Sequence, residues 1–440
     1  MKLSIPNKIP ISKEDLACVG LFFFLVKIPI RTVLAHFLHT SALFNTWVSI
    51  ALMYIPLMIM PFIRGKKRKV FDFCLVWVFM FLSCMITYAF HPDYEYWLFV
   101  GEFNIWRCIF YPDQAMYLYL FIRLIDDPEK IFNTLKRAAL LLLAYNLYKF
   151  VYSVYIQGYW KSTGVYRGEE GQYNLGFGYD VLFLFVVFMV LGKRNSKWYY
   201  CLAGISLFFI VVAGSRGPLL GVGLILLLQL LDIIRNRSLF ERIVLIGLFI
   251  VVMTVLLVNL TTIMMEVAFF LQRIGISSRT IMKVISGEFA KDIGRTRLYQ
   301  IAIDLIRTGG PFGNGIYGDR VAISSLTTMW IGYCHQIVLE ILVDFGYVLG
   351  SFFLVIMARR IIKILFAKES EWRSLYIIFL ISASQLILSG SYLYSSIFWG
   401  CFAVGVCWSE RNDITLSKMI RNKPSIFDSS FTSFSHWRTH

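Results

Sequence analysis

The sequence predicts an all-α, polytopic membrane protein with about twelve transmembrane helices, and three observations support this fold class. Hydrophobic residues make up 58% of the 440-residue chain. The mean hydropathy is +0.66, which is far above that of a soluble globular protein. Apolar runs close to the ~20 residues that a bilayer-crossing helix requires recur along the whole length. Such runs pack as helices, because lipid cannot satisfy the polar groups of the backbone.

Each predicted span is an apolar run long enough to cross a bilayer, and the positions of these runs divide the chain into four parts. Spans one to nine occupy 1–265, a polar extracytoplasmic loop occupies 266–335, spans ten to twelve occupy 336–409, and a cytoplasmic tail occupies 410–440. In chain order the predicted spans are about 15–38, 43–63, 70–90, 106–125, 135–156, 178–192, 198–213, 218–234, 242–265, 336–357, 374–390 and 393–409.

The basic residues predict the orientation of these spans. Most of the 43 Lys and Arg residues lie on segments that share a side with both termini, and Arg64–Lys69 is the densest of these segments. Cytoplasmic loops carry such an excess, so we expect cytoplasmic termini and an outward-facing 266–335 loop. The net charge of +16 follows from this bias and indicates contact with anionic lipid rather than with nucleic acid. The eight scattered cysteines lack metal-ligand spacing, so no metal site is predicted.

An outward loop between the fifth and sixth spans mixes aromatic residues with charge. Residues 157–180 combine Tyr and Trp with Arg167, Glu169, Glu170 and several glycines. Aromatic faces flanked by polar groups suit sugar rings, which favours a glycan-binding loop. An interfacial aromatic belt is the alternative.

A second outward turn, Gly214–Leu220, places Arg216 between glycines and just before Pro218, which begins the next helix. A guanidinium beside free amides at a helix N-terminus can bind an anion. The alternative is an arginine that reaches toward lipid headgroups.

The long loop contains one amphipathic helix, predicted over Arg297–Thr308, since its apolar residues recur at helical spacing. Such a helix can float at the membrane interface. The glycine-rich segment Pro311–Gly318 follows, and its amides can wrap a diphosphate or a sugar. The segment lacks the Lys and Ser/Thr of a nucleotide-binding P-loop, so ATP is not implied.

Several motifs occur in an order that resembles the O-antigen polymerase and O-antigen ligase superfamily. Arg295 precedes Tyr299 by one helical turn, Pro311–Gly313 forms the turn after the helix, and His335 precedes Gln336 at the head of a span. The Ser-Arg-Gly turn at Arg216 also matches. The resemblance covers roughly 175–350.

Spacing separates the two branches of this superfamily. The resemblance to the polymerase branch rests on an arginine followed at fixed distance by a glycine in each of two outward loops, as in Arg167 with Gly178 and Arg307 with Gly318. The ligase pattern after His335 fails at Leu349. We therefore favour a polymerase and keep a ligase as the alternative. A lipid-linked oligosaccharide flippase, which is a carrier and not an enzyme, is the third reading.

The resemblance implies glycosyl transfer from undecaprenyl diphosphate at the outer leaflet of the bacterial inner membrane, without a metal, nucleotide or other cofactor. Arg216 and Arg295 would neutralise the departing diphosphate, and His335 would act as base or bind phosphate. A flippase and a chain-length regulator are the implied protein partners. The implied substrate-binding residues are Arg167, Arg297, Tyr299, Arg307, Gly313, Gly315, Arg320 and Glu340.

Two carboxylates inside span ten, Glu340 and Asp344, are costly in lipid and therefore mark a candidate site. Alternatively, they pair with cations of other spans, namely Lys27, Arg31 or Lys149.

Overall fold

The described chain is helical throughout. The computed structural model describes residues 13–59, 66–102, 104–156, 175–213, 217–235, 237–274, 279–287, 295–327 and 332–421, and no β-strand occurs among them. This confirms the predicted all-α class for that part of the chain. The first half contains α1 (Lys13–Leu25), α2 (Lys27–Phe37), α3 (Ala42–Ile59), α4 (Lys67–Phe90), η1 (Pro92–Tyr94), η2 (Tyr96–Val100), η3 (Trp106–Phe110), α5 (Tyr117–Arg123), α6 (Pro128–Val151), η4 (Tyr152–Ile156), α7 (Leu175–Arg194) and α8 (Tyr199–Val212).

The second half carries the polar segment and the last helices. It contains α9 (Gly217–Arg235), α10 (Leu239–Val258), α11 (Leu260–Arg273), α12 (Arg279–Ile285), α13 (Arg295–Thr308), η5 (Gly310–Phe312), α14 (Gly318–Leu326), α15 (Ile337–Phe345), η6 (Gly346–Gly350), α16 (Ser351–Leu365), α17 (Glu371–Ser382), η7 (Ala383–Ile387) and α18 (Ser396–Arg421).

Four helices in the described residues are long and apolar enough to cross a membrane. They are α4, Gly176–Arg194 of α7, α9, and the segment Ile337–Leu365 that joins α15 to α16. A fifth follows if α1 and α2, which bend by 61° at their junction, form one span. The count of about twelve spans therefore stays a prediction. Helix α7 is the central one of these, because 78% of its most apolar window is buried, against 22% for α4 and α9.

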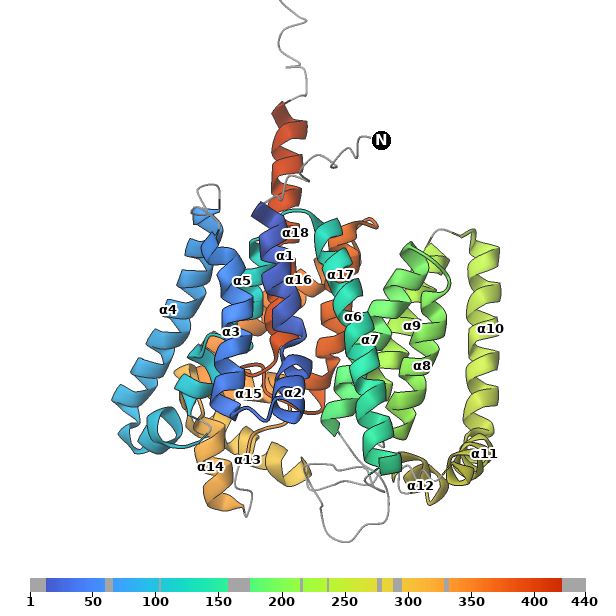
Figure 1. Cartoon of the computed structure of the whole chain (residues 1–440), viewed down its shortest axis with the longest axis horizontal. Coiled ribbons are helices and arrows are strands. Elements are labelled where there is room, and N and C mark those ends of the chain that lie inside the picture. Colours follow the sequence, from blue (N-terminus) through green and yellow to red (C-terminus); the bar gives the residue numbers. More distant parts are fainter. Residues whose placement is uncertain are drawn as a thin grey trace, which may run out of the picture.

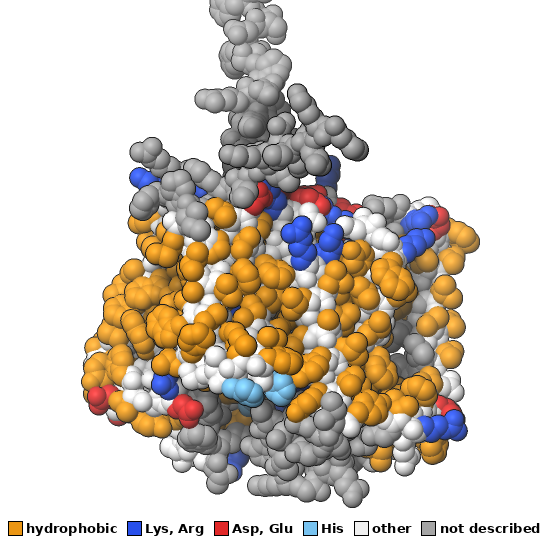
Figure 2. Space-filling model, viewed as in Figure 1, with side chains coloured by type: hydrophobic (Ala, Val, Ile, Leu, Met, Phe, Trp, Pro, Cys, Tyr) orange, Lys and Arg blue, Asp and Glu red, His pale blue; other side chains and the backbone are white. Residues whose placement is uncertain are grey.

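The helices stand side by side between the two ends of the molecule (Figure 1). The start of α1 and the end of α18 lie at one end, whereas α11 to α14 lie at the opposite end. On the face seen in Figure 2, hydrophobic side chains cover the middle and charged side chains gather toward both ends. This banding is what a bilayer-embedded protein requires.

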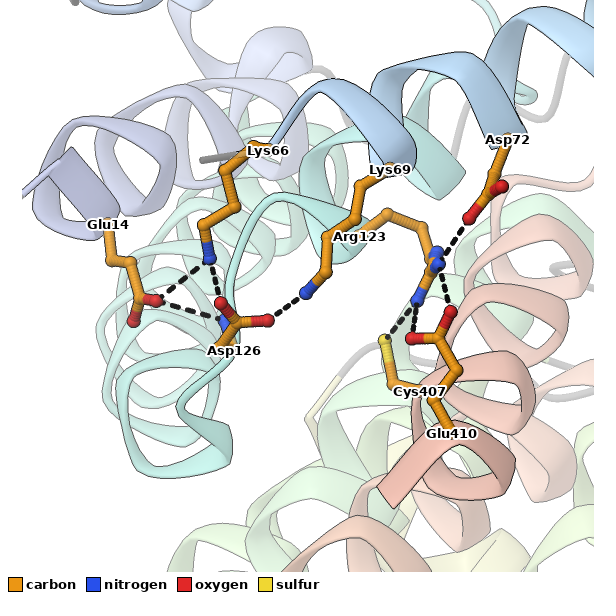
Figure 3. A network of polar contacts seen from close by, with 8 residues as sticks. All are labelled: Glu14, Lys66, Lys69, Asp72, Arg123, Asp126, Cys407 and Glu410. Atoms are coloured by element: carbon orange, nitrogen blue, oxygen red, sulfur yellow. Dashed lines mark hydrogen bonds and ion pairs between the residues drawn. The ribbon is translucent and has the colours of Figure 1, made fainter. Parts of the chain in front are cut away.

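A buried arginine ties three helices together at the end where the described chain begins and ends (Figure 3). Arg123 of α5 is fully buried and donates from Nη1 and Nη2 to the two carboxylate oxygens of Glu410 on α18, at 2.7 and 2.8 Å. Its Nη2 also donates to Asp72 Oδ2 on α4, at 2.6 Å. Two carboxylates pair with the two terminal nitrogens of this desolvated guanidinium, so the contact holds α5 between α4 and α18.

Two predicted domain boundaries fall inside helices. Residue 266 lies within α11, which runs to Arg273, and residue 410 lies within α18, which runs to Arg421. Neither Gly nor Pro interrupts these helices near the predicted boundaries, so a change in polarity alone does not end them.

Candidate functional site

The amphipathic helix α13 begins two residues before its predicted start and ends at the predicted Thr308. The predicted helix is thus confirmed. Its apolar face is covered by protein, because Leu298 and Ala302 are buried in a small cluster with Cys334 and with Val343 of α15. The helix therefore packs on α15 and does not float free of the bundle.

Packing of α13 brings Arg295 toward His335. Arg295 is the first residue of the helix and is partly buried. Its positive charge is close enough to affect the titration of the imidazole of His335. Arg295 and His335, which are far apart in the sequence, therefore lie near each other in the structure.

His335 sits just before α15 in a strained conformation. Its φ of 54° lies in the left-handed region, which side chains other than glycine rarely occupy. The imidazole is half-buried, its ring centroid lies 3.9 Å from that of Tyr333, and its Nδ1 is buried without a hydrogen-bond partner among the described residues. Burial, reinforced by the positive charge of Arg295, lowers the pKa of His335 to about 4. The imidazole is therefore neutral at physiological pH, as a base must be.

Arg320 and Glu340 form a closed, buried pair. Arg320 is 1% exposed, and its Nη2 lies 2.8 Å from Glu340 Oε1 and 2.8 Å from Ser391 Oγ. Its Nη1 donates to Asp319 Oδ1 at 2.5 Å. The second oxygen of Glu340 accepts from the amide of Tyr392 at 3.3 Å. The sequence predicts that both side chains bind substrate; in the structure each is buried and hydrogen-bonded to protein groups.

The cations proposed as alternative partners of Glu340 and Asp344 lie elsewhere. Arg31 pairs with Asp113 Oδ2 at 2.5 Å, and Lys27 donates to the Asp113 carbonyl. Lys149 lies 5.9 Å from the ring centroid of Phe177. That alternative is therefore wrong for Glu340, which pairs with Arg320. Asp344 Oδ2 accepts from the Tyr392 hydroxyl at 2.8 Å.

The glycine-rich segment Pro311–Gly318 is used to dock onto α15. The amides of Asn314 and Gly315 donate to the carbonyls of Val343 and Asp344 at 2.8 and 3.1 Å, and the Ile316 amide donates to Thr87 Oγ1 at 2.9 Å. These three amides are occupied within the protein and are not open to a diphosphate here. The segment instead fixes α14 against α15.

The remaining predicted contact residues are dispersed. Arg297 is exposed and donates to the Leu326 carbonyl at 2.9 Å. Arg307 is exposed and lies 3.7 Å from Asp304 Oδ1, and Tyr299 is partly exposed on α13. Arg167 and Arg216 lie outside the described residues, although α9 begins directly after Arg216, as expected from Pro218.

The part of the chain that carries these motifs is similar in sequence to a known protein family. Residues 201–354 match the O-antigen ligase family. The match covers about a third of the chain and includes Arg216, Arg295, Arg320 and His335, whereas Arg167 lies outside it. It supports the O-antigen polymerase and ligase superfamily that the motifs resemble. No curated protein matches the chain.

The O-antigen ligase match and the spanning helices together indicate an integral membrane protein. Within the part of the chain that the structure describes, no group of three or more His, Cys, Asp or Glu side chains is placed to hold a metal ion.

The sequence interpretation missed four residues that shape the site. Asp319, Tyr333, Ser391 and Tyr392 contact the Arg320–Glu340 pair or His335. A signal was present for Asp319, because it is adjacent to Arg320 in the sequence and an acidic and a basic residue are costly to bury unless each is paired. Ser391 and Tyr392 lie in a serine- and tyrosine-rich stretch whose partners only the fold reveals.

Proposed function

We propose that this protein polymerises lipid-linked oligosaccharide repeat units by glycosyl transfer at the outer leaflet of the bacterial inner membrane, with both termini in the cytoplasm. The donor is a glycan on undecaprenyl diphosphate. The acceptor is a sugar hydroxyl of a second lipid-linked unit. The observation that carries the proposal is the neutral, half-buried His335 beside the charge of Arg295, on a segment that matches the O-antigen ligase family.

The reaction balances without a further reactant. The acceptor oxygen bonds to the anomeric carbon of the donor, and the bond from that carbon to the diphosphate oxygen breaks. The hydroxyl proton passes to the neutral imidazole of His335. The diphosphate leaves as an anion, which Arg295 and Arg216 neutralise through charge-assisted hydrogen bonds.

The positions of the two polar ends support this assignment. His335 directly follows Cys334, which is buried against α13. Helix α13 lies at the end of the bundle opposite to the start of α1 (Figure 1). A lipid-linked diphosphate lies at the level of the headgroups, so a site near that end of the bundle is within its reach. Arg167, Arg297, Tyr299 and Arg307 remain proposed contacts for the glycan.

An O-antigen ligase that transfers the glycan to lipid A-core is the second candidate, because the matching family is described as O-antigen ligase. Both candidates share the donor and differ only in the acceptor. A flippase would share the donor lipid but would form no new glycosidic bond.

A reconstituted assay separates the three. Purified protein in liposomes receives undecaprenyl diphosphate-linked repeat units, with or without lipid A-core. A polymerase extends the lipid-linked glycan without lipid A-core. A ligase forms product only when lipid A-core is present. Transfer of glycan across the bilayer without any new glycosidic bond would contradict the enzymatic proposal.

A further inference from the structure

We propose that Asp319 and Arg320 are positioning residues that hold His335 for the reaction, although neither touches substrate. This inference rests on the proposed role of His335. It assigns a function to the buried Asp319–Arg320 ion pair, which takes no part in the proposed glycosyl transfer.

Asp319 is fully buried and divides its two oxygens between the partner arginine and the backbone before His335. Oδ1 accepts from Arg320 Nη1 at 2.5 Å. Oδ2 accepts from the amide of Cys334 at 3.0 Å. The carboxylate therefore connects the first turn of α14 directly to the residue that precedes the histidine.

Arg320 connects the same carboxylate to two further segments. Its Nη2 binds Glu340 on α15 and Ser391 after α17, each at 2.8 Å. Its guanidinium carbon also lies 5.9 Å from the ring centroid of Tyr333, whose hydroxyl accepts from the amide of Gly390 at 3.2 Å. The arginine thus joins α14, α15 and the 390–391 turn around the histidine segment.

Two features of His335 require such support. Its left-handed φ of 54° is a conformation that persists only where the surroundings hold it. Its Nδ1 has no hydrogen-bond partner among the described residues, so no carboxylate orients the ring through that atom. The orientation of the ring instead depends on the held backbone and on Tyr333, whose ring centroid lies 3.9 Å away.

The test compares Asp319→Ala with Asp319→Asn in full-length protein in liposomes. Alanine removes the acceptor for the Cys334 amide, whereas asparagine keeps one oxygen able to accept it. We expect Asp319→Ala to lower kcat about a hundredfold with little change in KM, since a displacement of about 1 Å at a reacting group has that effect. Asp319→Asn should retain more activity than alanine does.

A second readout does not depend on activity. Diethyl pyrocarbonate modifies accessible neutral imidazoles, and mass spectrometry measures the rate at each histidine. The rate at His335 should rise severalfold in Asp319→Ala, while the rate at the exposed His39 stays constant in the same molecules. If Asp319→Ala does not insert into the membrane, Arg320→Lys is measured in the same way. Lysine keeps a positive charge beside Asp319 but cannot reproduce the planar bridge to Glu340 and Ser391.

The matched control is Asp232→Asn. Asp232, in the last turn of α9, accepts at Oδ1 from Nη2 of Arg373, in the first turn of α17, at 2.6 Å. This variant disrupts a comparable ion pair and should leave both kcat and the modification of His335 unchanged. A folded Asp319→Ala protein with wild-type kcat and wild-type modification of His335 would overturn the inference.

The double variant Asp319→Ala, His335→Ala separates positioning from an independent role. If Asp319 acts through His335, adding Asp319→Ala to His335→Ala lowers the residual rate no further. If the rate of the double variant is lowered by the product of the two single-variant effects, the two residues act independently and the inference is wrong. Wild-type protein that makes no glycan product would sink the proposed function instead, while the modification rate of His335 would still report whether Asp319 holds the ring.

Discussion

Gly313 and Gly346 meet backbone to backbone. A Cβ on Gly313 would lie 2.3 Å from the amide nitrogen of Gly346, and a Cβ on Gly346 would lie 2.3 Å from that of Gly313. Both residues also have positive φ, 82° and 74°. Neither position accepts a side chain, so the Pro311–Gly318 segment and the end of α15 form one unit. Gly313 thus serves this contact.

We expect Gly313→Ala to reduce both folded yield and activity. The backbone of Gly313 (φ 82°, ψ −168°) lies in a region that essentially only glycine occupies, which costs another residue about 1–3 kcal/mol, and the clash with rigid backbone adds to this cost. Gly223→Ala on α9 is the control, because a Cβ there meets nothing within 4 Å. Thermal unfolding monitored in detergent measures the difference. A Gly313→Ala protein as stable as the Gly223→Ala protein would refute the close contact.

Arg216 and Arg295 should each be required for product formation. Charge-assisted hydrogen bonds are worth ~1.5–3 kcal/mol, so Arg→Ala at either position should slow the reaction at least about tenfold. Lysine should rescue poorly, because it lacks the planar, two-pronged geometry of arginine. Initial rates of glycan extension measure the effect. Arg237→Ala serves as the control, because Arg237 lies just before α10, pairs with Glu241 and has no proposed role in the reaction. Normal rates for both Arg→Ala variants would show that these arginines do not stabilise the departing diphosphate.

The fold was largely readable from the sequence where a helical period or a long apolar run was present. The α13 helix was predicted from the spacing of its apolar residues, and the stretch 70–90 corresponds to α4. The predicted span 106–125 is broken into η3 and α5. Pro112 cannot donate an amide, and its carbonyl accepts from Tyr54, so polar contacts with other helices stabilise the break.

The site was readable only in part. His335 and Arg295 are predicted from the sequence because their residue types and order are distinctive, and the structure places the charge of Arg295 near the imidazole. The roles of Arg320 and Glu340 were not, since the pairing depends on a fold that brings Ser391, far along the chain, to the same guanidinium. A buried arginine and a substrate-binding arginine look alike in a sequence. Only burial separates them.

The pH dependence should reflect a histidine with a lowered pKa. Because the pKa of His335 is about 4, the imidazole is neutral and able to accept a proton above that value. We expect kcat/KM to stay level from neutral pH to about pH 5 and to fall as the pH approaches about 4, whereas an unperturbed histidine would give a fall near 6.5. In Arg295→Gln the loss of positive charge should move the fall to higher pH. A fall centred near 6.5 in the wild-type enzyme would contradict the buried environment of His335.

Membrane topology offers a test that needs no substrate. A reporter active only outside the cytoplasm should be active when fused after Asn174 or Ser286, and inactive after Lys67 or Ser370. The physical reason is the excess of basic residues on the loops that contain the last two positions. An inactive reporter at Ser286 would place α12 to α14 in the cytoplasm and remove the outer-leaflet reaction.

We expect glycosyl transfer to proceed without a metal ion and to depend on His335. Wild-type and His335→Ala proteins, matched for insertion in liposomes, receive undecaprenyl diphosphate-linked repeat units in excess EDTA, and glycan length is followed over time. The wild-type protein should extend the glycan in EDTA, and His335→Ala should lose most turnover. Extension that stops in EDTA and returns with Mg²⁺, or an unimpaired His335→Ala protein, would contradict it.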